Sequence, residues 1–267
     1  MELSQRIKNI TPSQTLAITA KSRDLKAQGV DVISLSAGEP DFNTPDEIIE
    51  KTYEALKAGQ TKYTSASGIT ELKEAIIEKM KSGNGLDYEL SEVFVGTGAK
   101  HVLYNLFQAT LDPGDEVLIP TPYWVSYTEQ VKLAEGNPVI METDESTSFK
   151  ITPEIIDRHV TDRTRMLLLN SPSNPSGMVY TEEELRSLAE YLEKTDIVVV
   201  ADEIYETLVY DHPHISIASF SDKMKRNTLI VNGVSKSHSM TGWRIGYVCG
   251  DSDVVKGMTA LSSHSTS

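Results

Sequence analysis

Lys236 stands in a loop of small residues, Gly-Val-Ser-Lys-Ser, between two apolar segments, residues 229–231 and 245–248. Both segments are predicted to be strands, so this ammonium group would lie at the mouth of a sheet. A lysine held there can lose its proton and form a Schiff base with a carbonyl group. A solvated loop lysine is the ordinary alternative, and this residue alone does not decide between them.

A phosphate-binding turn is predicted where residues 92–95, a strand, lead through Gly98 into an apolar helix over 99–111. This arrangement directs backbone N–H groups and the positive helix end at an anion. His101 replaces the third glycine of the dinucleotide fingerprint, and the strand at 117–119 ends in Pro-Thr-Pro without an acid for a ribose. The turn therefore indicates a phosphate, but neither NAD nor ATP.

Three more polar or aromatic groups follow predicted strands. Trp124 lies in the Pro-flanked TPYW loop, and Asn174 lies in NSPSNPSG, residues 170–177. Asp202 directly follows the most strand-like segment, residues 197–201. The aromatic side chain is either core or a cover for a flat ligand. A buried carboxylate is costly without a partner, so Asp202 is either a structural cap or a partner for a cation.

These groups together match pyridoxal phosphate, an aldehyde on a pyridine ring with a phosphate. Asp202 would keep the ring nitrogen protonated, because an ion pair at ~4 Å contributes about 4 kcal/mol, or roughly three pKa units. Lys236 would bind the carbonyl carbon and later move a proton between the substrate Cα and the cofactor. Tyr205 and Asn174 would hydrogen-bond the phenolic oxygen of the ring. The phosphate would lie on the amides of Gly98, Ala99 and Lys100, with donors from Ser235 and Arg244.

The elements that must position these groups alternate between strand and helix from residue 92 to 250. This order predicts an α/β fold with a mainly parallel sheet and helices on both faces, and with ligands at the carboxyl ends of the strands. Further strands are predicted at 32–35 and 166–169. Further helices are predicted at 13–28, 69–80, 152–160 and 181–195, and at 44–58 with Thr44 as N-cap and Pro45 at the first helical position.

The composition of the chain narrows the classes of partner and the cellular compartments that are expected for it. The chain has 267 residues and a formal net charge of −14, which disfavours nucleic acid. It has one cysteine, Cys249, as is usual in a reducing compartment. No apolar run approaches the ~18 residues of a membrane helix, and the first residues lack a signal-peptide core. We expect a cytoplasmic protein without a metal site.

The chain resembles the fold-type-I pyridoxal-phosphate aminotransferases of class I and II, and most of all the bacterial aspartate aminotransferases. The matching stretches are SAGEPDFNTP, TKYTSASG, VGTGAKH, LDPGDEVLIPTPYWVSY, NSPSNPSG, ADEIYE and SKSHSMTGWRIGY, in this order. The resemblance implies the roles given above. It adds that Gly38, Trp124 and Asn174 contact the substrate. It also implies that Tyr63 reaches the phosphate of a neighbouring subunit in a homodimer.

The resemblance implies transamination between an L-amino acid, aspartate or glutamate, and a 2-oxo acid. A prephenate-type aminotransferase, a carbon–sulfur lyase and a non-catalytic cofactor-binding fragment are the alternatives. Residues 1–40 are expected to be an arm and part of a small domain, and residues 41–267 the cofactor-binding large domain. The chain ends at HSTS, whereas family members continue through a small domain whose arginine binds the substrate carboxylate. We therefore expect a truncated chain with an incomplete small domain. Gly233 stands where some relatives have a serine.

Overall fold

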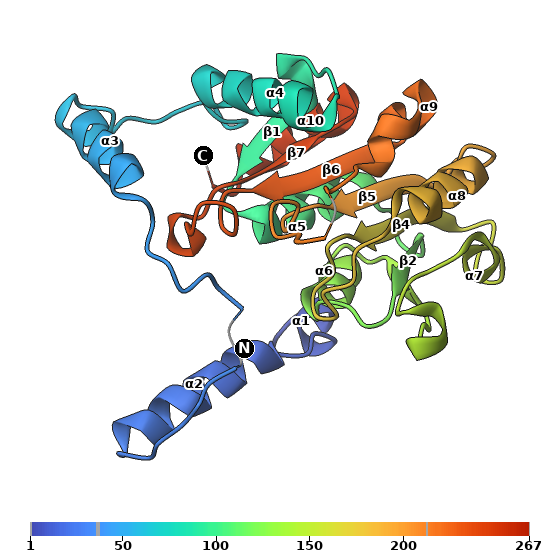
Figure 1. The fold of residues 1–267 in the computed structure, drawn as a ribbon, viewed down its shortest axis with the longest axis horizontal. Coiled ribbons are helices and arrows are strands. Elements are labelled where there is room, and N and C mark those ends of the chain that lie inside the picture. Colours follow the sequence, from blue (N-terminus) through green and yellow to red (C-terminus); the bar gives the residue numbers. More distant parts are fainter. Residues whose placement is uncertain (1, 36–37, 212, 267) are drawn as a thin grey trace.

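The computed structural model describes residues 2–35, 38–211 and 213–266 (Figure 1). Ser36 and Ala37, which belong to the SAGEPDFNTP loop, and His212 lie outside the described residues. No helix in the described part of the chain is long and apolar enough to span a membrane.

A seven-stranded sheet organises the molecule, with the strand order β1-β7-β6-β5-β4-β2-β3. Strands β2 to β6 pair in parallel, and β7 runs antiparallel to both of its neighbours, β1 and β6. The mainly parallel sheet predicted from the sequence is confirmed. The strands are β1 Val93–Gly96, β2 Glu116–Pro120, β3 Asn137–Met141, β4 Thr164–Asn170, β5 Val198–Asp202, β6 Thr228–Gly233 and β7 Gly246–Cys249.

Helices cover both faces of this sheet, as predicted. The described helices are α1 Gln5–Lys8, α2 Gln14–Ala27, α3 Asp46–Lys57, α4 Thr70–Asn84, α5 Ala99–Thr110, α6 Ser126–Leu133, α7 Pro153–Asp157, α8 Glu182–Leu192, α9 Asp222–Arg226 and α10 Ser252–Ser262. Short 3-10 turns occupy Leu90–Glu92, Glu145–Thr147, Ile217–Phe220 and Thr241–Trp243.

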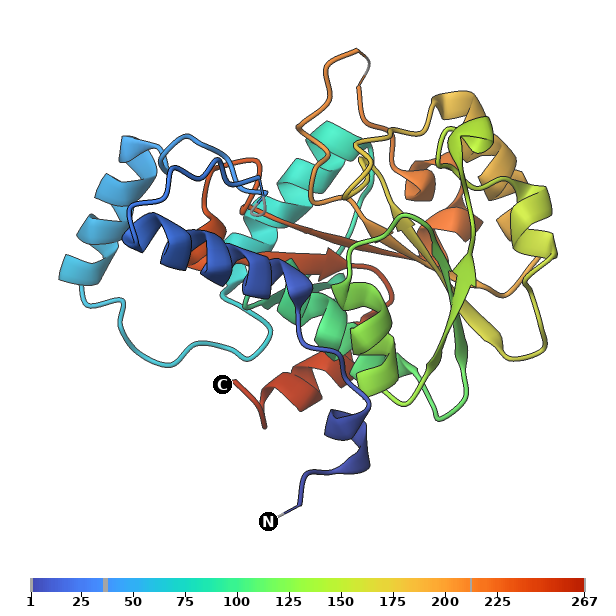
Figure 2. The ribbon, with the colours of Figure 1, turned by 90° about the horizontal axis from the view of Figure 1, so that it is seen from below.

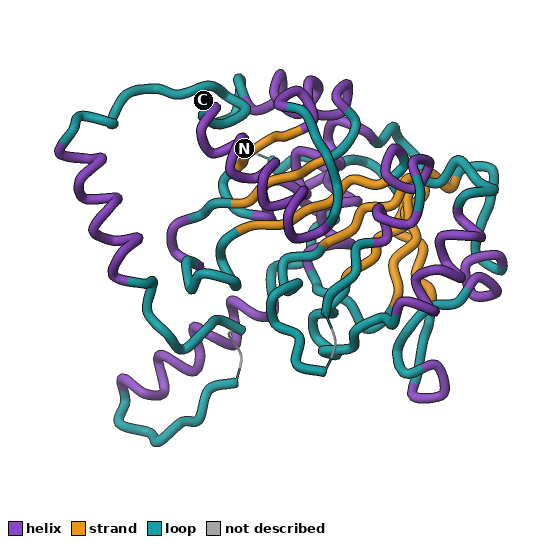
Figure 3. The backbone as a smooth tube through the Cα atoms, turned by 45° about the horizontal axis from the view of Figure 1, so that its top comes forward, coloured by secondary structure: helices purple, strands orange, loops and turns teal. Residues whose placement is uncertain are grey.

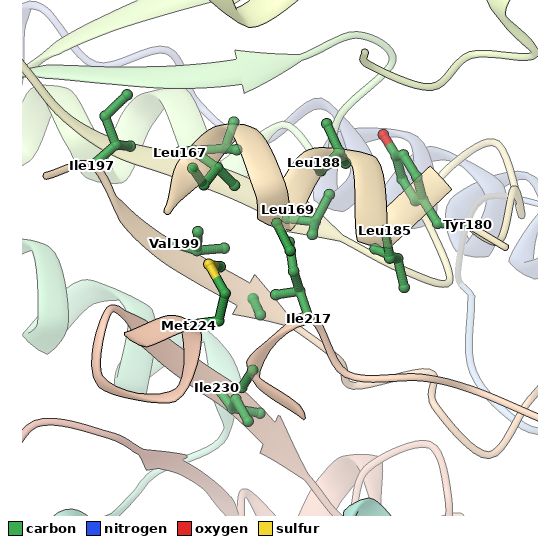
Figure 4. Close-up of a cluster of buried hydrophobic side chains, with 14 of the residues drawn as sticks. Leu167, Leu169, Tyr180, Leu185, Leu188, Ile197, Val199, Ile217, Met224 and Ile230 are labelled. Atoms are coloured by element: carbon green, nitrogen blue, oxygen red, sulfur yellow. The ribbon is translucent and has the colours of Figure 1, made fainter. Parts of the chain in front are cut away.

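Two apolar cores lie on opposite faces of the sheet because successive strand residues point to opposite sides. In β4, Leu167 and Leu169 pack with α4, α7, α8 and α9 (Figure 4), whereas Met166 and Leu168 pack with α5, α6 and α10. The sheet is therefore buried on both faces, which explains its nearly continuous apolar strands. A sheet held in this way gives the polar residues at its strand ends a rigid base.

Helix α8 begins as its sequence predicts. The Thr181 side chain accepts a hydrogen bond from the Glu184 amide, and the Glu184 side chain accepts one from the Thr181 amide. This capping box satisfies two N–H groups that the helix itself leaves free.

The first two long helices, α2 and α3, stand clear of the sheet (Figures 1 and 3). Neither has a buried residue, and apolar side chains such as Leu16, Ile49 and Leu56 are exposed. A contact from the Thr11 amide to the Glu129 carboxylate, at 2.8 Å, ties the segment before α2 to α6.

Two sequence predictions near this region are wrong. Residues 32–35 form no strand, because among the described residues no other strand lies beside them, and Ile33 and Leu35 are exposed. Thr44 does not cap α3. Its hydroxyl instead donates to the Ser239 carbonyl at 2.7 Å and accepts from the Trp243 indole at 2.9 Å, and Pro45 occupies the N-cap position. Helix α6 and strand β3 were not predicted from the sequence.

Candidate active site

A cavity of about 930 Å³ opens at the carboxyl ends of β4, β5 and β6. It gathers residues from seven separate stretches of the chain, as expected at this edge of an α/β sheet. Most of the residues that the sequence singled out line it, namely Gly38, Ala99, Lys100, Trp124, Asn174, Asp202, Tyr205, Ser235, Lys236 and Arg244.

Lys236 lies in the loop after β6 and extends into this cavity. Its ammonium nitrogen donates to the Gly38 carbonyl at 2.5 Å and lies 5.8 Å from the centre of the Tyr205 ring. Burial lowers the pKa of Lys236, the charge of Glu39 opposes this effect, and the nearby Arg244 adds to it. A lysine with a lowered pKa is the form that acts as a nucleophile or as a proton carrier near neutral pH.

Asp202 ends strand β5 and is 3% exposed. Its carboxylate accepts from the Tyr127 hydroxyl at 2.7 Å and from the Ile204 amide at 3.3 Å. Burial raises the pKa of Asp202 to about 6, although these two hydrogen bonds oppose the rise. Among the described residues no cation lies within ion-pair distance, so this carboxylate has capacity for a positively charged partner.

Tyr205 and Asn174 converge beside Asp202. The Asn174 amide nitrogen donates to the Tyr205 hydroxyl at 3.4 Å. The loop that carries Asn174 is held by Asn170, whose side chain accepts from the Asn174 backbone at 2.7 Å and donates to the Asp202 carbonyl at 2.8 Å. These bonds place two hydrogen-bond donors over the same part of the cavity.

The start of α5 meets Arg244 in a close contact that requires glycine. Gly98 has φ +83°, and a Cβ there would lie 2.2 Å from the Arg244 guanidinium. A Cβ on Gly246 would lie 2.2 Å from the Ala99 amide nitrogen. Two glycines therefore bring a guanidinium and the first amides of a helix together, where an anion is favoured.

Trp124 lies at the wall of the cavity near Lys100. The Lys100 ammonium lies 4.8 Å from the centre of its ring, and the Tyr127 ring meets it edge-on at 5.3 Å. Burial lowers the pKa of Lys100, and the charge of Arg244 adds to this effect. An anion bound in this corner would relieve the repulsion between these cations.

The donor set fits pyridoxal phosphate. Lys100, Arg244 and the helix start make an anion site, and Asp202 offers a buried negative charge for a ring nitrogen. Lys236 lines the same cavity. The opposite charges that line this cavity match the phosphate and the protonated ring of this cofactor.

Two expected residues lie elsewhere. Tyr63 is fully exposed, in the segment between α3 and α4, and does not line the cavity. Gly98 lies beneath Arg244 and not on the cavity surface. The packing explains why residue 233 is a glycine, because a Cβ there would lie 2.7 Å from the Ile245 carbonyl oxygen.

Tyr127 and Asn170 belong to the site but were not predicted from the sequence. Tyr127 comes from α6, which was not expected, and only the folded chain shows that its hydroxyl reaches β5. The available signal was a third aromatic residue three positions after Trp124. Asn170 opens the NSPSNPSG loop, so its position at a strand end was visible, although its two bonds were not.

The family model of the aminotransferases, "Aminotransferase class I and II", matches residues 30–267. The chain belongs to this family. It is 57% identical, over its full length, to 68% of the aspartate aminotransferase of Geobacillus stearothermophilus. It is 48% identical, over 99% of its length, to 68% of a probable aspartate/prephenate aminotransferase of Aquifex aeolicus (strain VF5).

A solved structure agrees with these relatives. The aspartate aminotransferase of Thermus thermophilus with maleate has a TM-score of 0.96 and 47% identity, and it covers all of this chain and 69% of its own. The chain is thus an aminotransferase that depends on pyridoxal phosphate and acts on amino acids and 2-oxo acids, and the fold predicted from the sequence is confirmed.

Proposed function

We propose that this aminotransferase moves an amino group between L-aspartate or L-glutamate and a 2-oxo acid in the cavity lined by Lys236 and Asp202. One observation carries the assignment of the site. A lysine with a lowered pKa and a buried carboxylate, which has no cationic partner among the described residues, share a single cavity at the strand ends. A structural role for either residue would not require both to face the same space.

Each active-site residue has a role in the reaction that follows from its position in the cavity. Bound pyridoxal phosphate supplies an electron-accepting ring that stabilises negative charge at the substrate Cα. Asp202 would hold the ring nitrogen in its protonated form, and Tyr205 and Asn174 would donate hydrogen bonds to the phenolic oxygen. Lys236 would accept the proton from the substrate Cα and later donate it again. Its lowered pKa makes more of the neutral amine available for this step.

The anion end of the cavity holds the phosphate. We assign the amides of Gly98, Ala99 and Lys100 to it, together with Arg244 and the Ser235 side chain, which is 8% exposed. Positive helix ends and guanidinium groups both favour bound phosphate. This contact would fix the cofactor while Lys236 exchanges between bound and free states.

The substrate would lie against Gly38, Trp124 and Asn174. A Cβ on Gly38 would meet no described atom within 4 Å, so a ligand can approach its backbone closely. The names of the relatives favour aspartate, and those at 48% identity add prephenate. We therefore expect higher rates with L-aspartate and 2-oxoglutarate than with L-glutamate and prephenate.

Initial rates with these two substrate pairs test the substrate assignment. Oxaloacetate formed from L-aspartate would support it. A preference for prephenate, or release of a thiol from a sulfur amino acid, would replace it with a prephenate-type aminotransferase or a carbon–sulfur lyase. Binding of pyridoxal phosphate without turnover of any pair would indicate a cofactor-binding fragment.

We also propose a homodimer with shared sites and a cytoplasmic location. The exposed side chains of Ile49, Tyr53 and Leu56 on α3, with Tyr63, support an interface on this side. The single buried thiol of Cys249 fits a reducing compartment. Residues 1–40 would be the arm and part of a small domain, and 41–267 the large domain. Sedimentation with and without Tyr63→Ala tests the dimer, and a monomer at all concentrations would exclude it.

A further inference from the structure

A second group of charged side chains surrounds the turn that follows Asp202, and none of them lines the active-site cavity. Glu203 follows Asp202, and its carboxylate lies 3.2 Å from the His214 imidazole. The two side chains are only 4% and 6% exposed. His214 belongs to the loop after Tyr205, drawn in orange beside α4 in Figure 2. Burying an ion pair costs free energy, because both charged groups lose their hydration. A buried pair at this position is therefore expected to have a structural or functional role.

A second ion pair lies at the other end of the turn that begins at Glu203. The Glu206 carboxylate forms an ion pair with Lys79 of α4 and accepts from the Asn84 side chain at 3.2 Å. The backbone between the pairs is a tight turn, in which the Glu206 amide donates to the Glu203 carbonyl at 2.9 Å. Glu203 and Glu206 therefore lie before and after Tyr205 in the chain. Each is held by a partner that does not line the cavity.

The charges of this cluster balance when His214 is protonated. Lys79 is positive and Glu203 and Glu206 are negative, which leaves one negative charge for an imidazolium to neutralise. The other buried titratable groups facing the cluster are Tyr88, Tyr247 and Cys249, and burial raises the pKa of each, so they add no charge near neutral pH.

The pKa of His214 agrees with this balance. Burial opposes the charged ring, but the contact with Glu203 and the charge of Glu206 outweigh it and raise the pKa above its ordinary value of 6.5. Within the described residues, no hydrogen bond reaches either ring nitrogen or the facing Glu203 Oε2, so the 3.2 Å contact between them is an ion pair. Glu203 is thus the group that compensates the burial of this ring.

A metal ion is the competing occupant. Ligand atoms of Glu203, Glu206 and His214 all lie within 4.8 Å of one another. A divalent ion would, however, have to share Glu206 with the Lys79 ammonium, which repels it. A proton on His214 neutralises the cluster without displacing any group, so the arrangement favours it.

We propose that Glu203 and His214, together with Glu206 and Lys79, are positioning residues that hold the turn around Tyr205, so that Tyr205 and Asp202 keep their places in the cavity. These residues touch neither the cofactor site nor the substrate site. They act through the turn, which carries Tyr205 and follows directly on Asp202 at the end of β5, and both of these side chains line the cavity.

Variants of the 267-residue chain test this role. We expect Glu203→Gln and His214→Gln each to weaken binding of pyridoxal phosphate at pH 7 about tenfold, or about 1.4 kcal/mol. Each leaves one buried polar group without its charged partner. The double variant replaces the pair with two neutral amides and should recover most of the affinity. His159→Gln, which changes a histidine far from the cavity, is the matched control and should bind as the parent does.

A titration without cofactor gives an independent readout. Imidazole NMR of the parent chain should show His214 titrating above its ordinary pKa of 6.5, and Glu203→Gln should lower that pKa. Because the folded pKa lies above 6.5, the contribution to stability is complete below 6.5 and is lost as the pH rises through the raised value.

Three results would overturn the proposal. One is a neutral His214 at pH 6.5 in the folded parent. Another is unchanged cofactor affinity in both single variants when their folding is intact. The third is a rise in Tm with added Zn²⁺ that Glu203→Gln abolishes, which would make the cluster a metal site. If both single variants fail to fold, the titration of the parent chain still decides.

Discussion

The Tyr127 hydroxyl donates to the Asp202 carboxylate at 2.7 Å, and both residues are buried. Tyr127 comes from α6 on one face of the sheet, and Asp202 ends the central strand β5. This bond stabilises the charged carboxylate, while burial disfavours it. The balance leaves Asp202 with a pKa of about 6. A cationic ring nitrogen bound beside the carboxylate would lower this pKa.

Replacing Tyr127 with Phe removes the only side-chain hydrogen bond to the Asp202 carboxylate that the described residues provide. The pKa of Asp202 should then rise above about 6, and pyridoxal phosphate should bind about tenfold more weakly at pH 7. Fluorescence titrations from pH 5 to 8 measure both effects. Tyr104→Phe, on α5 away from Asp202, is the control, and equal behaviour of the two variants would contradict the role of Tyr127.

Asp202→Asn should stabilise the cofactor-free chain. The folded pKa of about 6 lies above the ordinary 3.8, so the free energy of unfolding falls as the pH rises from about 4 to 6. At about 1.4 kcal/mol per tenfold change in proton affinity, the asparagine variant should gain up to about 3 kcal/mol above pH 6.

Urea unfolding at pH 4 and pH 7.5 checks this expectation. The gain should vanish at pH 4, where the carboxylate is protonated in both chains. The same variant should bind pyridoxal phosphate more weakly than the parent. A variant less stable than the parent at pH 7.5 would show that Asp202 has a compensating partner in the free chain.

Gly98→Ala and Gly114→Ala form a matched pair. Both glycines have positive φ, +83° and +91°, so each alanine costs about 1 kcal/mol of backbone strain. Only the Cβ at position 98 collides with Arg244, whereas position 114 is open. We expect both variants to lose similar stability. Only Gly98→Ala should lose affinity for pyridoxal phosphate, and it should lose less for pyridoxal, which has no phosphate.

Much of the fold follows from local patterns. The apolar run before Asp202 forms a strand with an apolar core on each face, and Thr181 with Glu184 begins α8 as their spacing requires. The polar groups after each strand meet because parallel strands end at the same edge. For this reason Lys236, Asp202 and Asn174 could be placed in one site from sequence.

The misses have a common physical cause, which is contact between distant segments. Thr44 has the sequence of an N-cap, but it bonds to Ser239 and Trp243, nearly two hundred positions away. Residues 32–35 have strand-forming side chains, but no strand in the described part of the chain lies beside them. Tyr127 gains its role only from the packing of α6 against β5.

The most direct test of the site is to locate the covalent bond to the cofactor. The 267-residue chain would be mixed with pyridoxal phosphate, reduced with borohydride, digested and analysed by mass spectrometry. Lys236→Ala would be treated in parallel, and Lys150→Ala, which changes a half-buried lysine paired with Glu184, is the control. We expect the label on Lys236 in the parent and in Lys150→Ala, and no specific label in Lys236→Ala. A label on another lysine of the folded parent would contradict the account.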